Sequence, residues 1–164
     1  MIGFAKNILN YSISTFGSKI IGFISIPIFT RLLNPDDYGI INIIGSYAII
    51  ISVLFTFNLQ SSIVRYYHEN KKLIGGFLFQ IVTIQSFLVA MLYIFISFNK
   101  NYVSNFLSLP IESVSFLAPI AYGFIIENWI RNYFKAFGGS NVIRNYTLLR
   151  TYIGFFLALI IIYS

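Results

Sequence analysis

The stretch PIFTRLLNPDDYGIINI, residues 27–43, separates two long apolar segments and contains two of the chain's four prolines. Asn34 favours the N-cap of a helix, and Pro35 suits the first helical position. Asp36 and Asp37 then fall in the first turn, where carboxylates complement the positive end of the helix dipole. Asp37 also follows Asn34 at the spacing of a capping box. The stretch therefore predicts a short connection between two helices, the second beginning near residue 35.

The composition places these helices in a membrane. The chain is 57% hydrophobic and 10% charged, with a mean hydropathy of +0.79, whereas a typical soluble domain is about a quarter charged. Apolar runs long enough to cross a bilayer follow one another with short polar breaks. We predict an all-α, polytopic helix bundle that forms a single transmembrane domain over residues 1–164. Its spans lie at about residues 8–33, 40–64, 73–98, 114–136 and 146–164.

The basic residues predict the orientation of the spans. With the N-terminus in the cytoplasm, only Arg31 and Lys100 fall outside and Lys19 lies within the membrane, which agrees with the positive-inside rule. The inner residues are Lys6, Arg65, Lys71, Lys72, Arg131, Lys135, Arg144 and Arg150. Aromatic residues expected at the membrane interfaces are Tyr66, Tyr67, Tyr102, Trp129 and Tyr133.

Composition also excludes several functions. The net charge of +6 comes from residues at the ends of apolar runs, so we expect no nucleic-acid partner. The absence of cysteine excludes disulfides and thiolate metal sites, and we expect no metal and no cofactor. The fifth span ends at Ser164 without a polar tail. We expect an N-terminal part of a longer protein; the alternative is a complete small protein whose last span ends flush with the membrane.

Lys19 is the most informative charge, because the apolar run after it is too short to cross a bilayer alone. It lies roughly 15 Å along the helix from Ile8. A charge at that depth costs on the order of 3 kcal/mol and commonly faces a bundle interior or a water-filled cavity. The alternative is that the side chain snorkels to the cytoplasmic interface.

Glu127 and Arg131 stand one turn apart in the fourth span, in the favourable order for an ion pair. They form either a neutralised pair near the inner interface or the basic wall of a cavity, in which Glu127 holds Arg131 or titrates. Pro119 predicts a kink in the same helix.

Other polar residues of the spans predict helix packing. Ser14, Ser18, Gly22 and Ser25 share one helical face, and small residues at that spacing let another helix approach closely. A contact with substrate is the alternative. Asn58, Gln60, Gln80 and Gln85 are expected to form hydrogen bonds between helices, and we assign no role to His68.

Few residues suit catalysis. There is one histidine, no HExxH pattern and no glycine-rich phosphate loop. Asp36 and Asp37 could bind a metal-bound sugar nucleotide in a membrane glycosyltransferase, but the start of a helix accounts for both, and we predict no catalytic residue.

Three motifs carry a family resemblance. PIFTRLLNPDDYGI resembles the P-x-x-T-R-x-L-x-P-x-x-Y-G signature of Wzx-type polysaccharide, or O-antigen, flippases. NLQSSIVRYYHE and NYFKAFGG are similar to later segments of that family, in the same order. The resemblance implies a multi-pass protein of the bacterial inner membrane, within the multidrug/oligosaccharidyl-lipid/polysaccharide exporter superfamily. Its members have two six-helix bundles, of which about five spans are present here.

The resemblance also implies a substrate: undecaprenyl-diphosphate-linked oligosaccharide, moved by alternating access for O-antigen, capsule or exopolysaccharide synthesis. A diphosphate needs cationic partners in a low-dielectric region. The candidate substrate-binding residues are Lys19, Arg31, Arg65 and Arg131, with Glu127 as a charge partner or ion-coupling residue. Arg31 matches the arginine of the first motif. The expected partners are the lipid-linked oligosaccharide, membrane lipids and other polysaccharide-assembly proteins.

Three alternatives stay open. A small-molecule antiporter of the same superfamily would favour carboxylates in its cavity, where only Glu127 is near a span interior. A membrane enzyme would use Asp36 and Asp37. A remnant or assembly partner would not transport.

Overall fold

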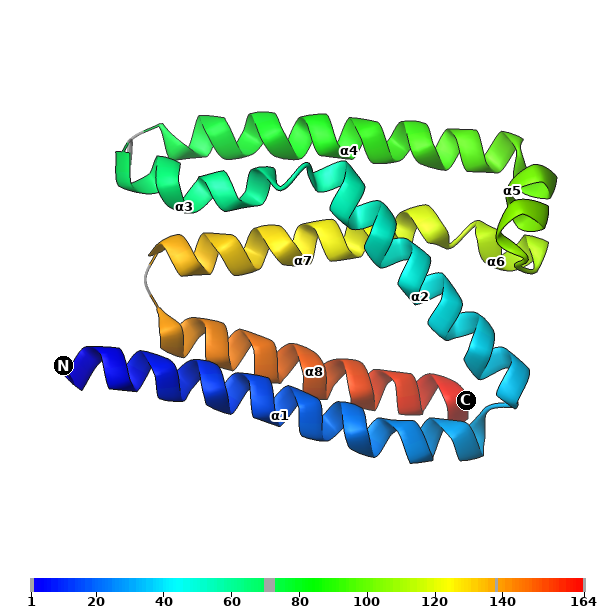
Figure 1. The fold of residues 1–164 in the computed structure, drawn as a ribbon, viewed down its shortest axis with the longest axis horizontal. Helices are drawn as coiled ribbons and strands as arrows, with labels where there is room; N and C mark the ends of the chain where they lie inside the picture. Colours follow the sequence, from blue (N-terminus) through cyan, green and yellow to red (C-terminus); the bar gives the residue numbers. More distant parts are fainter. Residues whose placement is uncertain (1, 70–72, 138, 164) are drawn as a thin grey trace. The chain divides into compact units, whose positions relative to one another are not determined.

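The computed structural model describes residues 2–69, 73–137 and 139–163, which are helical and contain no strand (Figure 1). The helices are α1 (Ile2–Leu32), α2 (Pro35–Thr56), α3 (Leu59–Glu69), α4 (Ile74–Phe98), α5 (Lys100–Leu107), α6 (Ile111–Val114), α7 (Leu117–Phe137) and α8 (Ser140–Tyr163). Five stretches are long and apolar enough to cross a membrane: Asn7–Leu32, Pro35–Thr56, Ile74–Phe98, Ile111–Ala136 and Ser140–Ile162. The predicted all-α polytopic fold is confirmed. Lys71 and Lys72 lie outside the described residues, as do the side chains of Lys6 and His68.

The connection between α1 and α2 is as short as the opening stretch predicts. α1 continues through Pro27 to Leu32, and α2 begins at Pro35. The carbonyl oxygen of Asn34 accepts the first hydrogen bond of α2. The side chains differ from a capping box, because Asn34 Nδ2 donates directly to Asp37 Oδ2 over 3.4 Å. The two residues therefore stabilise the connection through a side-chain bond.

The second predicted span, residues 40–64, is not one helix. α2 ends at Thr56, and Phe57 and Asn58 take left-handed conformations with φ of 45° and 53°. The Asn58 carbonyl then accepts a hydrogen bond from the Ser61 backbone N–H, 3.1 Å away, at the start of α3. Neither a proline nor a glycine occurs at the break, which explains why the sequence pattern does not reveal it.

The break between the third and fourth predicted spans, residues 99–113, is also largely helical, because it contains α5 and most of α6. The main helix of the fourth span begins at Leu117, so Pro119 lies in its first turn. Backbone N–H groups in that turn have no partner within the helix, so a proline there removes no hydrogen bond. The predicted kink at Pro119 is therefore wrong.

The helices form two compact units, of which the first contains Met1–Tyr38 and Phe137–Ser164. Here α1 packs along α8 (Figure 1). The buried positions of α1 are Asn10, Ser14 and Ile21, on the face of the predicted small residues. Gly17 approaches α8 so closely that an added Cβ atom would lie 2.6 Å from Leu148 Cδ2. The packing prediction is confirmed for Ser14 and Ser18, which face α8, but it is wrong for Gly22, which is exposed with nothing within 4 Å of an added Cβ atom.

The second unit, Gly39–Ala136, contains a continuous hydrophobic core. The buried residues of α2 repeat every four positions: Ile44, Ala48, Ser52 and Thr56. Those of α4 share one face in the same way: Ile74, Ile81, Gln85, Val89 and Ile96. Spacings of four and seven place residues on one side of a helix, so each helix presents one stripe to the core and leaves its other sides outward.

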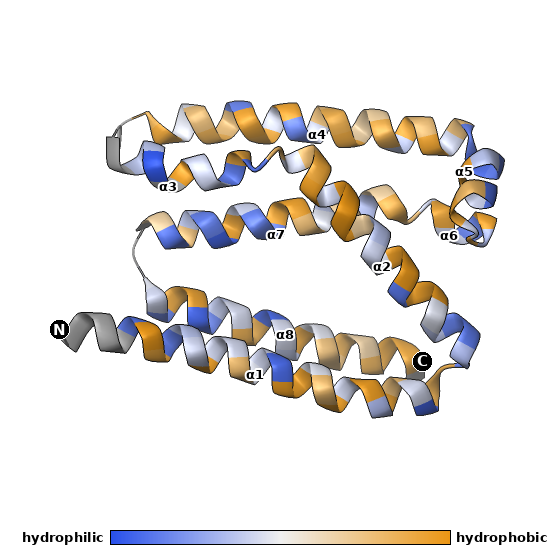
Figure 2. Cartoon of the chain, viewed as in Figure 1, coloured by the Kyte–Doolittle hydropathy of each residue, from blue (hydrophilic) through white to orange (hydrophobic). Residues whose placement is uncertain are grey.

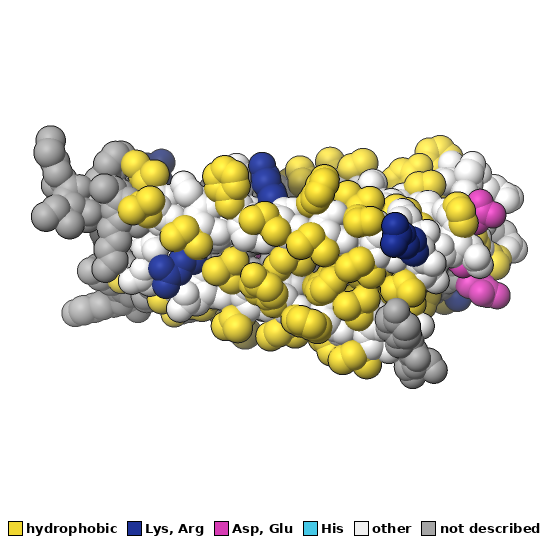
Figure 3. Space-filling view, turned by 90° about the horizontal axis from the view of Figure 1, so that it is seen from below, with side chains coloured by type: hydrophobic (Ala, Val, Ile, Leu, Met, Phe, Trp, Pro, Cys, Tyr) yellow, Lys and Arg dark blue, Asp and Glu magenta, His cyan; other side chains and the backbone are white. Residues whose placement is uncertain are grey.

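Large apolar side chains cover the outward sides of the long helices in both units. Phe23, Phe79 and Phe98 are among the most exposed. Figure 2 shows hydrophobic residues along α4, while hydrophilic residues gather on α3 and the second half of α7. Figure 3 shows one face covered mostly by hydrophobic side chains, with scattered basic groups and acidic groups at one end. Such a surface suits lipid rather than water, and the chain is a multi-pass membrane protein.

Candidate functional site

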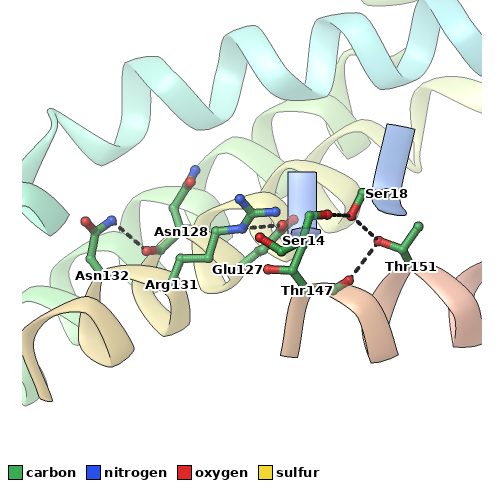
Figure 4. Close-up of polar contacts among 8 residues, drawn as sticks. All are labelled: Ser14, Ser18, Glu127, Asn128, Arg131, Asn132, Thr147 and Thr151. Atoms are coloured by element: carbon green, nitrogen blue, oxygen red, sulfur yellow. Dashed lines mark hydrogen bonds and ion pairs between the residues drawn. The ribbon is translucent and has the colours of Figure 1, made fainter. Parts of the chain in front are cut away.

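The polar side of α7 carries the one predicted charge pair. Arg131 Nε donates to Glu127 Oε1 over 3.0 Å, and Asn132 Nδ2 donates to the carbonyl oxygen of Asn128 over 2.8 Å (Figure 4). Residues four apart lie on the same face of a helix, so the pairs form a stripe. The side chain of Glu127 is 12% exposed and that of Arg131 39%. The carboxylate is thus enclosed while the guanidinium reaches outward.

Arg131 retains most of its donors. Of the five N–H donors of a guanidinium, only Nε–H is used within the part of the chain that the structure describes. Both terminal nitrogens, Nη1 and Nη2, are without a protein partner there. Two parallel N–H donors are the geometry that binds a phosphate oxygen pair. Arg131 therefore has the chemistry of an anion-binding group held in place by Glu127.

The other predicted cations lie on other helices. Lys19 is exposed on α1 and makes no hydrogen bond or ion pair with described residues, and Arg65 is exposed on α3. Arg31 is exposed in the last turn of α1. It lines a surface hollow of about 410 Å³ together with apolar residues of the same helix, including Pro27. Both alternatives for Lys19 remain predictions.

A buried hydrogen-bond network joins three helices of the second unit. Gln85 Nε2 donates to the carbonyl oxygen of Thr56 over 3.1 Å, and Gln85 Oε1 accepts a hydrogen bond from Trp129 Nε1. Trp129 is 6% exposed, so its ring packs against protein and does not face lipid, while its depth at the membrane interface stays a prediction. The indole is buried because it satisfies the amide oxygen of Gln85. The prediction that Gln85 joins helices is confirmed.

A seam between α4 and α7 has two hollows. Tyr122 lines both of them, and its hydroxyl forms a hydrogen bond of 2.7 Å with Ser86 Oγ. The larger hollow, about 410 Å³, is lined mainly by apolar side chains, and the smaller, about 250 Å³, includes Gln85 and Trp129. Neither hollow contains a charged side chain, so neither is suited to a diphosphate.

A second polar cluster joins α1 to α8. Asn10 Nδ2 donates to Ser140 Oγ over 2.9 Å and to Asn141 Oδ1 over 2.7 Å. Asn10 Oδ1 accepts a hydrogen bond of 2.7 Å from Arg144 Nη1, and Ser140 Oγ donates to Asn7 Oδ1 over 2.7 Å. Asn10 is 4% exposed. From the sequence, the charge of Arg144 predicts only that it lies on the inner side of the membrane. Its hydrogen bond to Asn10 joins two helices, and the sequence does not reveal it because the two residues are 134 positions apart.

The same two helices are joined further along by hydroxyl groups. Thr151 Oγ1 donates to Ser18 Oγ over 3.3 Å, and Ser18 Oγ donates to the carbonyl oxygen of Ser14 (Figure 4). These hydrogen bonds pair hydroxyl groups that lie between α1 and α8. Ser14 and Ser18 therefore contribute to the packing of the two helices in this structure.

Comparison with known proteins identifies the family. Residues 4–163 match the family model described as polysaccharide biosynthesis protein. The chain belongs to this family. The match agrees with the resemblance to Wzx-type flippases and connects this multi-pass membrane protein with polysaccharide biosynthesis. Searches of the curated proteins and of the solved structures gave no significant match.

In this polysaccharide biosynthesis protein, the aspartates of the opening stretch lie at the start of α2. Asp36 and Asp37 are exposed in its first turn, and Asp37 contacts Asn34. Among the residues that the structure describes, no three His, Cys, Asp or Glu side chains come close enough to hold a metal ion. The geometry around the two aspartates is that of a helix start.

Proposed function

We propose that this polysaccharide biosynthesis protein takes part in moving undecaprenyl-diphosphate-linked oligosaccharide across the bacterial inner membrane by alternating access. The products would be O-antigen, capsule or exopolysaccharide. Under this proposal the chain acts as a transporter and not as an enzyme. The observation that carries it is the family match over residues 4–163, on a chain with five candidate membrane spans.

The physical requirement of such a substrate supports the same proposal. The polyprenyl tail can stay in lipid, but the diphosphate must pass a region in which an isolated charge costs on the order of 3 kcal/mol or more. Arg131 offers two unoccupied terminal nitrogens within the described structure, and Glu127 fixes its Nε. Lys19, Arg31 and Arg65 remain candidates for further steps of the path.

A transport assay tests the proposal directly. The 164-residue chain is reconstituted into vesicles that contain a fluorescent lipid-diphosphate oligosaccharide, and the rate at which the sugar reaches the opposite leaflet is measured. We expect faster movement than in vesicles without protein. If the helical, correctly inserted chain left this rate unchanged, the transport proposal would be wrong for it.

Two further arms separate the alternatives. An antiporter would couple small-molecule movement to an ion gradient without moving the lipid-linked sugar. A membrane glycosyltransferase would form a new glycan product in detergent, where no leaflets exist. Either result would replace the flippase proposal.

A further inference from the structure

The helix α5 carries an exposed aromatic pair that the core does not use. Tyr102 is 68% exposed and Phe106 76% exposed. Their rings stack with centroids 6.4 Å apart and an interplanar angle of 9°. Two large rings held together on one turn of a helix form a continuous apolar surface.

The other sides of α5 have different character. Val103 and Leu107 pack against the hydrophobic core of the second unit. Asn101 and Asn105 are exposed. At about 100° per residue, the aromatic pair lies between the core-facing side and the asparagine side. The asparagines are thus nearly opposite the core, and the aromatic pair points sideways.

The position of α5 in the chain indicates what covers the aromatic pair. α5 follows directly after the candidate span Ile74–Phe98 and comes before the candidate span Ile111–Ala136. The chain turns at Asn99, so α5 lies at the end of α4 instead of extending it (Figure 1). Ser104 Oγ donates to the carbonyl oxygen of Leu109 over 2.6 Å, which fixes the return toward α6. The segment therefore lies between the end of one candidate span and the start of the next.

We propose that α5 is an interfacial helix, with the Tyr102–Phe106 pair in the lipid headgroup region and Asn101 and Asn105 in water. Aromatic side chains favour this depth because they combine an apolar ring with, in tyrosine, a polar tip. A helix with separate core, lipid and water sides fits a boundary between bilayer and water. This inference concerns anchoring of the bundle and does not depend on transport.

Spin labelling tests the proposal, since the chain has no cysteine. Tyr102→Cys, Phe106→Cys and, as the matched control on the same helix, Asn105→Cys are each labelled with a nitroxide. The full chain is reconstituted in phosphatidylcholine vesicles. Collision of the label with oxygen, which concentrates in lipid, is compared with collision with a water-soluble nickel chelate.

We expect labels at 102 and 106 to favour oxygen over the chelate by several-fold relative to the label at 105. Labels at 102 and 106 that are as accessible to the chelate as the label at 105 would overturn the proposal; a water-facing platform for stacking sugars would give that result. Circular dichroism checks that each labelled chain keeps its helix content. If one of the two aromatic variants does not fold, the label at the other aromatic position is compared with the label at 105 in the same way.

Discussion

The side-chain amide of Gln85 donates a hydrogen bond to the carbonyl oxygen of Thr56, the last residue of α2, with 3.1 Å between Nε2 and O. The helix stops there, so this carbonyl has no partner further along its own helix. In a membrane, an unpaired backbone group costs several kcal/mol. Gln85 supplies the missing donor, and Trp129 fixes the orientation of its amide.

Replacing Gln85 with leucine removes both bonds while keeping the side chain's bulk. Thr56 O and Trp129 Nε1 would be left buried without partners, and we expect a loss of about 1–3 kcal/mol in unfolding free energy. Chemical unfolding in detergent micelles measures it. Gln80→Leu is the control, because Gln80 lies on the same helix and is exposed. Equal losses for the two variants would contradict this role of Gln85.

Two glycines of α1 should respond oppositely to alanine. At Gly22 an added Cβ meets nothing within 4 Å, so Gly22→Ala should stabilise the helix by about 0.5–1 kcal/mol. At Gly17 the added atom lies 2.6 Å from Leu148 Cδ2, and overpacking costs about 1–3 kcal/mol. Thermal unfolding of both variants measures the difference. If Gly17→Ala raised the stability as much as Gly22→Ala, Leu148 on α8 would be able to move aside without cost, and the close packing at Gly17 would not matter for stability.

Arg131 should matter for transport through its paired donors and not only its charge. A charge-assisted hydrogen bond contributes about 1.5–3 kcal/mol, so Arg131→Gln should slow flipping by roughly tenfold or more. Arg131→Lys keeps the charge but lacks the planar fork, and we expect an intermediate rate. Lys135→Gln, one turn further on and exposed, serves as the control. If it slows flipping as much as Arg131→Gln, general surface charge would explain the effect.

The aspartates at the start of α2 provide a test against catalysis. Asp36→Asn and Asp37→Asn each remove a carboxylate from the positive end of the helix, which should cost about 0.3–1 kcal/mol of stability. Thermal unfolding and the flipping rate are measured together. We expect a small stability loss and an unchanged rate. A complete loss of activity with normal stability would instead support a chemical role.

The number of spans and the start of α2 follow from the sequence because hydropathy and helix capping are local properties. The small residues at Ser14 and Ser18 likewise predict a packed face. The break after Thr56 could not be predicted in this way. The only local sign of the break is Asn58, a residue type that tolerates positive φ. The break leaves the carbonyl oxygen of Thr56 without a helical partner, and Gln85, 29 residues away, donates the hydrogen bond that satisfies it.

The same distinction between local and long-range contacts applies to the candidate site. The Glu127–Arg131 pair depends on spacing within one helix, so the sequence reveals it. The burial of Trp129 depends on Gln85, and the anchoring of Arg144 depends on Asn10. Both involve partners far along the chain, and spacing alone cannot identify such partners.

The break at Phe57 and Asn58 also has a mechanical consequence. A continuous helix transmits a twist about its axis along its whole length, but two residues outside helical geometry uncouple one segment from the next. A rotation of α2 would therefore act on α4 directly, through the hydrogen bond from Gln85. The amide of Gln85 is thus a lateral link from the end of α2 to a neighbouring span, in addition to the backbone that continues into α3.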